Sequence, residues 1–119
     1  MTPIVWVKEY KANDLLPVPG IKGRFKRYVD GRETGAHLIH GLGMLAPGED
    51  MGWHDHPEEE VFFVISGCGV VRWKVDNEIC EAMIGPYSAF YKVGGVPHQM
   101  VNTGSEPLIG VVAKVSAHG

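Results

Sequence analysis

Short apolar runs separated by turn-forming residues recur along the 119-residue chain. Amphipathic segments of helical length are missing from the sequence. Runs of β-branched and aromatic residues between glycine and proline clusters therefore predict strands. We expect nine strands: IVWV, RFKRYV, HLIHGLGML, VFFVI, VVRWKV, EICEAMI, SAFYKV, HQMVN and LIGVVAKV. Many short strands at this spacing indicate an all-β fold, a sandwich or a barrel, in a single domain over residues 1–119.

The dipeptide Asp76-Asn77 predicts a β-hairpin between two of these runs. Both residue types tolerate the positive φ angles of a two-residue turn. In this register Trp73 pairs with Cys80. Cys68 then falls far from Cys80 along the ladder, so we expect two separate thiols.

The run VFFVI is apolar at every position, and therefore on both faces of its strand. A strand with one face in water would alternate between apolar and polar residues. We expect the outer face, which carries Val61, Phe63 and Ile65, to be covered by a second sheet or by another subunit. Of these arrangements we favour a homodimer.

Composition excludes several kinds of partner. The chain is 45% hydrophobic and 21% charged, with a formal net charge of -3, so we expect no nucleic-acid partner and no membrane partner. No apolar stretch approaches the ~20 residues of a membrane-spanning helix, and the first residues lack the layout of a signal peptide. We therefore expect a cytoplasmic protein.

Candidate metal ligands gather around one short stretch, GWHDHPEEEVFF. His54 and His56 are two residues apart, so in an extended segment their side chains point to the same side. Glu60 opens the following strand and can reach the same point if the chain turns back through residues 57–59. His98, before another strand, offers a third imidazole. Three imidazoles and a carboxylate suit Fe(II), Mn(II), Ni(II), Cu(II) or Zn(II).

The residues around these ligands resemble the two signature motifs of the cupin superfamily. The first motif, G-x5-H-x-H-x3-E-x6-G, is reproduced in full from Gly48 to Gly67. The second motif, G-x5-P-x-G-x2-H-x3-N, is matched at Gly95, His98 and Asn102. This sequence departs from the second motif in two places, because Val93 replaces the proline and Gly85 lies two residues too far upstream.

The resemblance implies a fold, a metal site and an assembly. The implied fold is a double-stranded β-helix, the small jelly-roll barrel of a monocupin. The implied metal ligands are His54, His56, Glu60 and His98. Cupins of this size usually form dimers, often by strand exchange near the N-terminus.

Other site residues are predicted from strand parity. Phe62 and Val64 share the parity of Glu60, and Met100 and Asn102 share that of His98, so these four could form a substrate pocket or ordinary barrel core. Phe90 and Tyr91 point to opposite faces, and a Tyr91 hydroxyl facing inward could act as a catalytic acid or base. Five cationic residues could each anchor an anionic substrate, and the sequence selects none of them: Arg24, Arg27, Arg32, Arg72 and Lys92.

The remaining histidines and acids lack motif positions. We expect His37, His40 and His118 to be ordinary surface or core residues. Glu58 and Glu59 are expected to be solvated turn carboxylates. Asp55 has the opposite parity to the two histidines, so we expect it to face solvent or to orient a ligating imidazole.

These features together predict a metal-dependent enzyme that acts on a small polar metabolite. We favour Fe2+ and dioxygenase-type chemistry, with Mn2+, Ni2+, Zn2+ or Cu2+ as other candidate metals. A redox-neutral isomerase, lyase or decarboxylase is the first alternative. A non-catalytic cupin that binds a small molecule is the second.

Overall fold

The computed structural model describes residues 5–18, 21–35 and 37–115 of the chain. Its regular elements are the 3-10 helix η1 (Ala12–Asp14), the helix α1 (Gly31–Thr34) and the strands β1 (Leu16–Val18), β2 (Ile21–Val29), β3 (Leu38–Leu45), β4 (Glu59–Ser66), β5 (Gly69–Val75), β6 (Glu78–Ile84), β7 (Ala89–Lys92), β8 (His98–Asn102) and β9 (Leu108–Val115). The all-β class is confirmed. No helix in the described part of the chain has the length and apolar character needed to cross a membrane.

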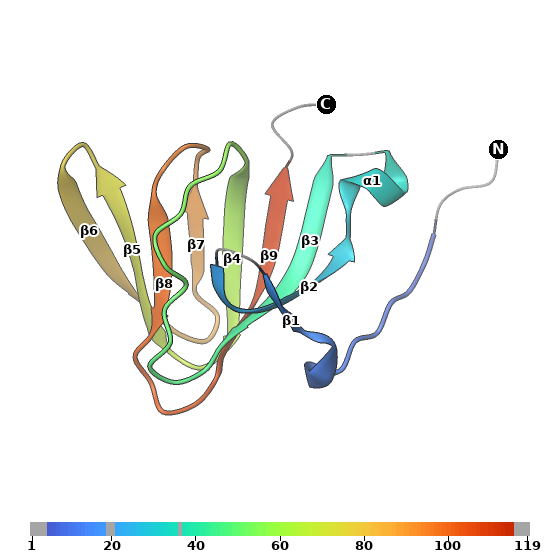
Figure 1. Cartoon of the computed structure of the whole chain (residues 1–119), viewed down its shortest axis with the longest axis horizontal. Helices are drawn as coiled ribbons and strands as arrows, with labels where there is room; N and C mark the ends of the chain where they lie inside the picture. The colour runs from blue at the N-terminus through green and yellow to red at the C-terminus, as the bar shows by residue number, and fades with distance from the viewer. Residues whose placement is uncertain (1–4, 19–20, 36, 116–119) are drawn as a thin grey trace.

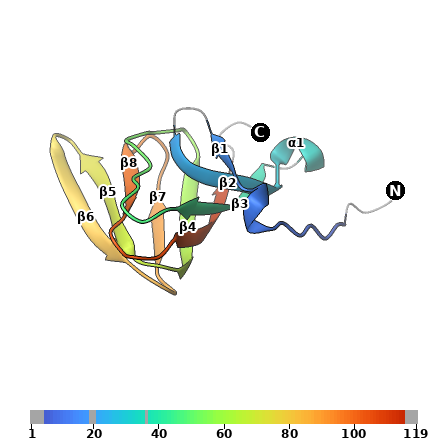
Figure 2. The ribbon, with the colours of Figure 1, turned by 60° about the horizontal axis from the view of Figure 1, so that its bottom comes forward.

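Two antiparallel sheets face each other in the structure (Figure 1). The larger sheet has the strand order β1-β2-β3-β9-β4-β7, and the smaller sheet has the order β6-β5-β8. Figure 2, with the bottom of the molecule turned forward, shows β5 and β6 on one side and β1, β2 and β3 on the other.

The loop between β3 and β4 acts as a further strand on the open edge of the smaller sheet. The amide of Gly48 donates to the Asn102 carbonyl at 3.0 Å, and the amide of Met51 donates to the Met100 carbonyl at 2.9 Å. Figure 1 shows this loop running beside β8. The backbone groups at the edge of β8 are therefore satisfied, and the histidines of the loop are held at a fixed height along that strand.

The hydrophobic core lies between the two sheets. Alternate residues of β4 point inward, and Glu60, Phe62 and Val64 are all buried. Because inward side chains from both sheets interdigitate, the core is a single cluster. Its buried members are Leu45, Met51, Phe62, Val64, Val71, Ile84, Met100 and Leu108.

The predicted hairpin is confirmed. Trp73 pairs with Cys80 across the turn, and Asp76 adopts a φ of 55°. Cys68 and Cys80 are free thiols.

One strand prediction is wrong. Of the run IVWV, Ile4 lies outside the described residues, and residues 5–7 form no strand. Instead, β1 forms at Leu16–Val18, a proline-containing stretch that is not among the predicted strands. The physical reason is that β1 is an edge strand of the larger sheet, where Pro17 has no ladder hydrogen bond to lose. The other eight segments are confirmed as strands.

The outer face of β4 is not covered by the second sheet. Phe63 is 38% exposed and Ile65 is 48% exposed, because the smaller sheet packs against the opposite face of the larger one. Of the two arrangements considered for this face, coverage by a second sheet is therefore wrong.

A substitution at Gly110 tests the packing of the hydrophobic core. A methyl group at Gly110 would overlap the buried ring of Phe62. We predict that Gly110→Ala lowers the free energy of unfolding by about 1–3 kcal/mol, because an overfilled core forces side chains out of place. Gly85→Ala is the control, since nothing lies within 4 Å of the added carbon. Urea denaturation measures both variants, and equal stabilities would contradict the described packing.

Candidate metal centre

The first two histidines of the centre are brought together by backbone pairing. The amide of His54 donates to the His98 carbonyl at 3.1 Å, and the amide of His98 donates to the His54 carbonyl at 2.9 Å. Residues directly opposed in an antiparallel bridge project their side chains to the same face. The two imidazole centroids are accordingly 4.2 Å apart.

His56 completes a cluster of three imidazoles. Its ring centroid lies 5.8 Å from that of His54 and 5.2 Å from that of His98. One ring nitrogen of each histidine lies within 4.8 Å of those of the other two. Two nitrogens that each lie ~2.1 Å from one metal are at most ~4.2 Å apart, so a shared cation would need only small side-chain shifts to bind all three rings.

Backbone carbonyls set the tautomers of two of the rings. His54 Nδ1 lies 2.9 Å from the Gly52 oxygen, and His98 Nδ1 lies 2.8 Å from the Val96 oxygen. A carbonyl oxygen can only accept, so in both rings Nδ1 carries the proton and Nε2 keeps a free lone pair. A ligating histidine is commonly oriented in this way, with its other nitrogen donating to a carbonyl.

His56 has a different orienting partner. Its Nδ1 lies 3.1 Å from the Glu58 carboxylate and 3.4 Å from Lys92 Nζ. Lys92 Nζ also donates to the Glu58 backbone oxygen at 3.0 Å. A proton on Nδ1 of His56 would be directed at the Glu58 carboxylate, and the Nε2 of His56 would then keep a lone pair as well. Glu58 was expected to be a solvated turn carboxylate, and the structure instead places it against the cluster.

Glu60 closes the cluster on its fourth side. Its carboxylate oxygens lie 3.3 Å from His56 Nε2 and 3.5 Å from His98 Nε2. Both of these nitrogens are buried and have no hydrogen-bond partner among the described residues. The short distances to Glu60 are therefore contacts and not hydrogen bonds. Lone pairs on two nitrogens and two oxygens face one another, which is unfavourable unless positive charge lies between them. The donor set therefore fits a divalent cation.

The ionisation of the centre favours metal binding. Burial alone would raise the pKa of Glu60. A proton shared with His56 or His98, and the positive charge of Lys114, lower it, so this pKa lies well below its usual range. A bound cation would take the place of such a proton. Burial also lowers the pKa of His54. Glu60 is therefore a carboxylate and His54 a neutral imidazole near pH 7, which are the forms that bind a metal.

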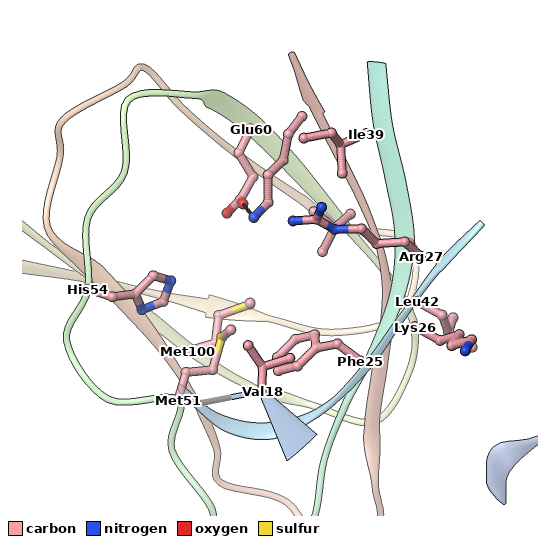
Figure 3. A pocket seen from close by; sticks show the side chains of 13 residues that line it. Val18, Phe25, Lys26, Arg27, Ile39, Leu42, Met51, His54, Glu60 and Met100 are labelled. Atoms are coloured by element: carbon pink, nitrogen blue, oxygen red, sulfur yellow. Dashed lines mark ion pairs between the residues drawn. The ribbon is translucent and has the colours of Figure 1, made fainter. Parts of the chain in front are cut away.

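A cavity of about 140 Å³ opens beside the cluster (Figure 3). His54 and Glu60 form part of its lining, and Figure 3 shows both side chains directed into it. Of the four residues predicted to form the pocket, Met100 lines the cavity.

The other three predicted pocket residues are placed elsewhere. Phe62 and Val64 belong to the hydrophobic core, where they are 3% and 0% exposed. Asn102 is buried and donates from Nδ2 to the Leu45 and Glu106 carbonyls at 2.9 and 2.8 Å. Strand parity placed these side chains on the correct face, but parity does not distinguish the packed part of that face from the open part.

Tyr91 does not reach the cluster. It is opposite Val61 in the ladder, which puts it on the outer face of the sheet with 58% of its surface exposed. Its hydroxyl donates to the Glu59 carboxylate at 2.7 Å. A catalytic role for Tyr91 at this centre has no support in the geometry, since Phe90 is the residue of the pair that faces inward, toward His98.

Several cavity residues were not singled out in the sequence. Lys114 is the most important, because its Nζ lies 3.7 Å from Glu60 Oε2. Lys114 lies an even number of positions after Leu108 and Val112 on β9. This spacing is the signal in the sequence that could have identified it as a cation on the inner face. Arg27 was named only as one of five cationic candidates, and the structure places it in the lining.

Comparison with known proteins agrees with this architecture. The family model described as Cupin domain matches residues 41–113, which is more than half of the chain. A search of curated proteins finds no match.

Solved structures with the same fold are numerous. The chain is similar to a Cupin 2 conserved barrel domain protein from Salinispora arenicola, with a TM-score of 0.78 and 19% identity over 97% of this chain and 92% of that one. A Klebsiella pneumoniae protein with a double-stranded beta-helix domain has a TM-score of 0.73 and 17% identity, over 95% and 93% of the two chains. A predicted oxalate decarboxylase from Thermotoga maritima has a TM-score of 0.73 and 18% identity, over 92% and 99%.

Identities this low establish the fold and leave the activity open. The implied double-stranded β-helix is therefore confirmed. With the family match over residues 41–113, this fold and a histidine cluster that could bind metal, the chain belongs to the cupin family.

Proposed function

We propose that this cupin is a metal-dependent enzyme that acts on a small polar metabolite. The observation that carries the proposal is the convergence of His56 Nε2 and His98 Nε2 on the carboxylate of Glu60. Both nitrogens are buried and have no hydrogen-bond partner within residues 5–18, 21–35 and 37–115. With His54, these two histidines and Glu60 give four protein ligands. A metal that prefers five or six ligands would keep one or two positions open for a substrate.

Within this class we favour Fe2+ and dioxygenase-type chemistry. When bound, the metal supplies Lewis-acid polarisation or, as iron, activation of dioxygen. The chain's own residues provide the surroundings. Glu60 and His54 are held in metal-binding form by their contacts and burial, and the apolar side chains of Met51 and Met100 line the cavity beside them. An apolar lining excludes water and protects reactive species from side reactions.

A redox-neutral decarboxylase, isomerase or lyase is the second candidate. The similarity of this chain to the predicted oxalate decarboxylase of Thermotoga maritima supports it as an analogy at the level of the fold. Lewis-acid chemistry at the same four ligands would serve such a reaction. A non-catalytic cupin would use the same cavity for binding alone.

Removal of a ligand tests the metal site directly. We predict that the chain purified without chelator, or loaded anaerobically with Fe2+, holds one transition metal, and that His98→Ala lowers its metal affinity at least about tenfold. His37→Ala is the control, since His37 is exposed. Elemental analysis gives the metal content, and circular dichroism checks that each variant folds. Full metal content in His98→Ala would contradict the ligand assignment.

Oxygen uptake separates the candidate reactions. With the iron-loaded chain and a panel of catechols, β-diketones, thiols and keto acids, we predict oxygen consumption in step with loss of one substrate class. Turnover that continues without oxygen would contradict the dioxygenase and favour the redox-neutral enzyme. Binding without turnover of any compound would favour the non-catalytic cupin.

We also propose a homodimer formed through the outer face of the larger sheet. This face is apolar across four neighbouring strands, and large exposed apolar patches commonly mark protein interfaces. A second copy of the chain would bury it. The apolar residues of this face are Leu38, Leu42, Val61, Phe63, Ile65, Tyr91, Val111 and Val115.

Light scattering tests the dimer. We predict a mass in solution of twice the 13.0 kDa of one chain, and a shift to the single mass in Phe63→Ser. Val75→Ser is the matched control, because Val75 is an exposed apolar residue of the smaller sheet, 52% exposed. A single-chain mass for the unmodified protein at micromolar concentration would overturn the proposal.

A further inference from the structure

The cavity beside the metal centre has an excess of positive charge. Its lining includes three cationic residues, Lys26, Arg27 and Lys114, and one acidic residue, Glu60. Lys26 is directed elsewhere, since its Nζ lies over the Tyr10 ring at 5.0 Å from the centroid. The cavity therefore retains two cationic side chains, Arg27 and Lys114, and one carboxylate, Glu60.

The strand register explains why these cations face inward. Lys114 pairs with Glu60 across β9 and β4, and buried Glu60 fixes this as the inner face. Arg27 pairs with Gly41 on β3. The backbone of β2 packs closely on Gly41, where an added Cβ would lie 2.8 Å from the Lys26 oxygen. Figure 3 shows the Arg27 guanidinium directed into the cavity, toward Glu60 and its ion pair. The Arg27 side chain is 51% exposed, which places its guanidinium at the open side of the cavity, within reach of a ligand that enters from solvent.

Arg27 is only partly satisfied by its neighbours. Its Nη1 lies 3.3 Å from the Asp30 carboxylate, and this is its one ion pair within the described part of the chain. Asp30 is shared, because it also accepts from the Arg32 backbone amide at 3.0 Å and pairs with the Arg32 guanidinium at 3.3 Å. A guanidinium has five N–H donors in a fork that matches a carboxylate. Arg27 thus keeps donors for a ligand.

The rest of the wall is apolar. Val18, Phe25, Met51, Met100 and Val112 line the cavity, and Figure 3 shows the two methionine side chains below the His54 ring. Methionine adapts to the shape of an apolar ligand. The volume of about 140 Å³ is close to that of cavities of ~150 Å³ that accommodate benzene.

We propose that this cavity binds a small apolar acid of about benzoate size in its carboxylate form. The carboxylate lies against Arg27 and Lys114, and the apolar body lies against Phe25, Met51 and Met100, which brings the ligand to the edge of the histidine cluster. This inference deepens the proposed function, on which it rests, because it names the substrate class of the same site. Among small polar metabolites, it selects monocarboxylates with an apolar body.

Ligand binding tests this inference without turnover. The probe is benzoate, titrated by calorimetry into the full chain loaded with redox-inert Zn2+. Benzyl alcohol has a similar size without the charge, and acetate has the charge without the apolar body. We expect benzoate to bind at least about tenfold more tightly than either compound, because both halves of the cavity are used. Equal affinities for benzoate and benzyl alcohol, or for benzoate and acetate, would overturn the proposal.

Two arginine variants locate the carboxylate. Arg27→Gln should weaken benzoate binding about tenfold, the loss expected for a charge-assisted hydrogen bond. Arg24 is, like Arg27, an exposed arginine of β2, but it pairs with Met44 on the other face and does not line the cavity. Arg24→Gln removes the same charge and should therefore change the affinity less than about twofold. Arg27→Lys keeps the positive charge but loses the paired N–H donors of the guanidinium. Its benzoate affinity should lie between those of Arg27→Gln and Arg24→Gln. Equal effects of Arg27→Gln and Arg24→Gln would overturn the assignment.

The same titration distinguishes this inference from the proposed function. A chain that holds no Zn2+, yet binds benzoate in a way that depends on Arg27, would defeat the metal centre and support the carboxylate site. A chain that holds Zn2+ and binds benzoate without dependence on Arg27 would defeat the carboxylate site alone.

Discussion

The backbone bridge between His54 and His98 joins two segments of the chain that are distant in sequence. Its reciprocal hydrogen bonds, at 3.1 and 2.9 Å, fix the loop of residues 46–58 along β8. The two imidazoles then face the same point, and His56 follows two residues later with its side chain on the same side. Without this pairing the loop would carry its histidines away from Glu60. The candidate site therefore depends on a backbone interaction more than on any contact between its side chains.

Burial makes the centre costly for the fold. Glu60 is 6% exposed and His98 is 1% exposed, and polar groups in such positions destabilise a protein unless they are paired. Lys92 is also buried, and burial lowers its pKa. A cation between the imidazoles and Glu60 would satisfy the lone pairs that the protein leaves open, so binding of a metal there would stabilise the folded chain.

Strand parity and turn signals in the sequence were enough to predict most strands and the local part of the cluster. The features predicted in this way are local, and the structure has each of them. They are the spacing of His54 and His56, the start of β4 at Glu59, next to Glu60, and the turn at Asp76. The cupin motif supplied the one long-range element, the approach of His98.

Other features depended on partners that the sequence does not specify. Residues 5–7 have the composition of a strand but gain no neighbour, whereas β1 forms despite Pro17 because an edge position tolerates it. Arg27 could be chosen from the cationic residues only after its pairing with Gly41 was known. Glu58 reaches His56 because of the path of the turn, which has no periodic signal.

The central claim is that three Nε2 lone pairs and the Glu60 carboxylate converge to bind one cation. Nuclear magnetic resonance of the imidazole ¹⁵N nuclei, recorded with and without Zn2+, tests this claim most directly. The account predicts protonated Nδ1 atoms in His54 and His98 in both states, with large shifts of Nε2 in His54, His56 and His98 when Zn2+ is added. Protonated Nε2 atoms that do not respond to Zn2+ would contradict it.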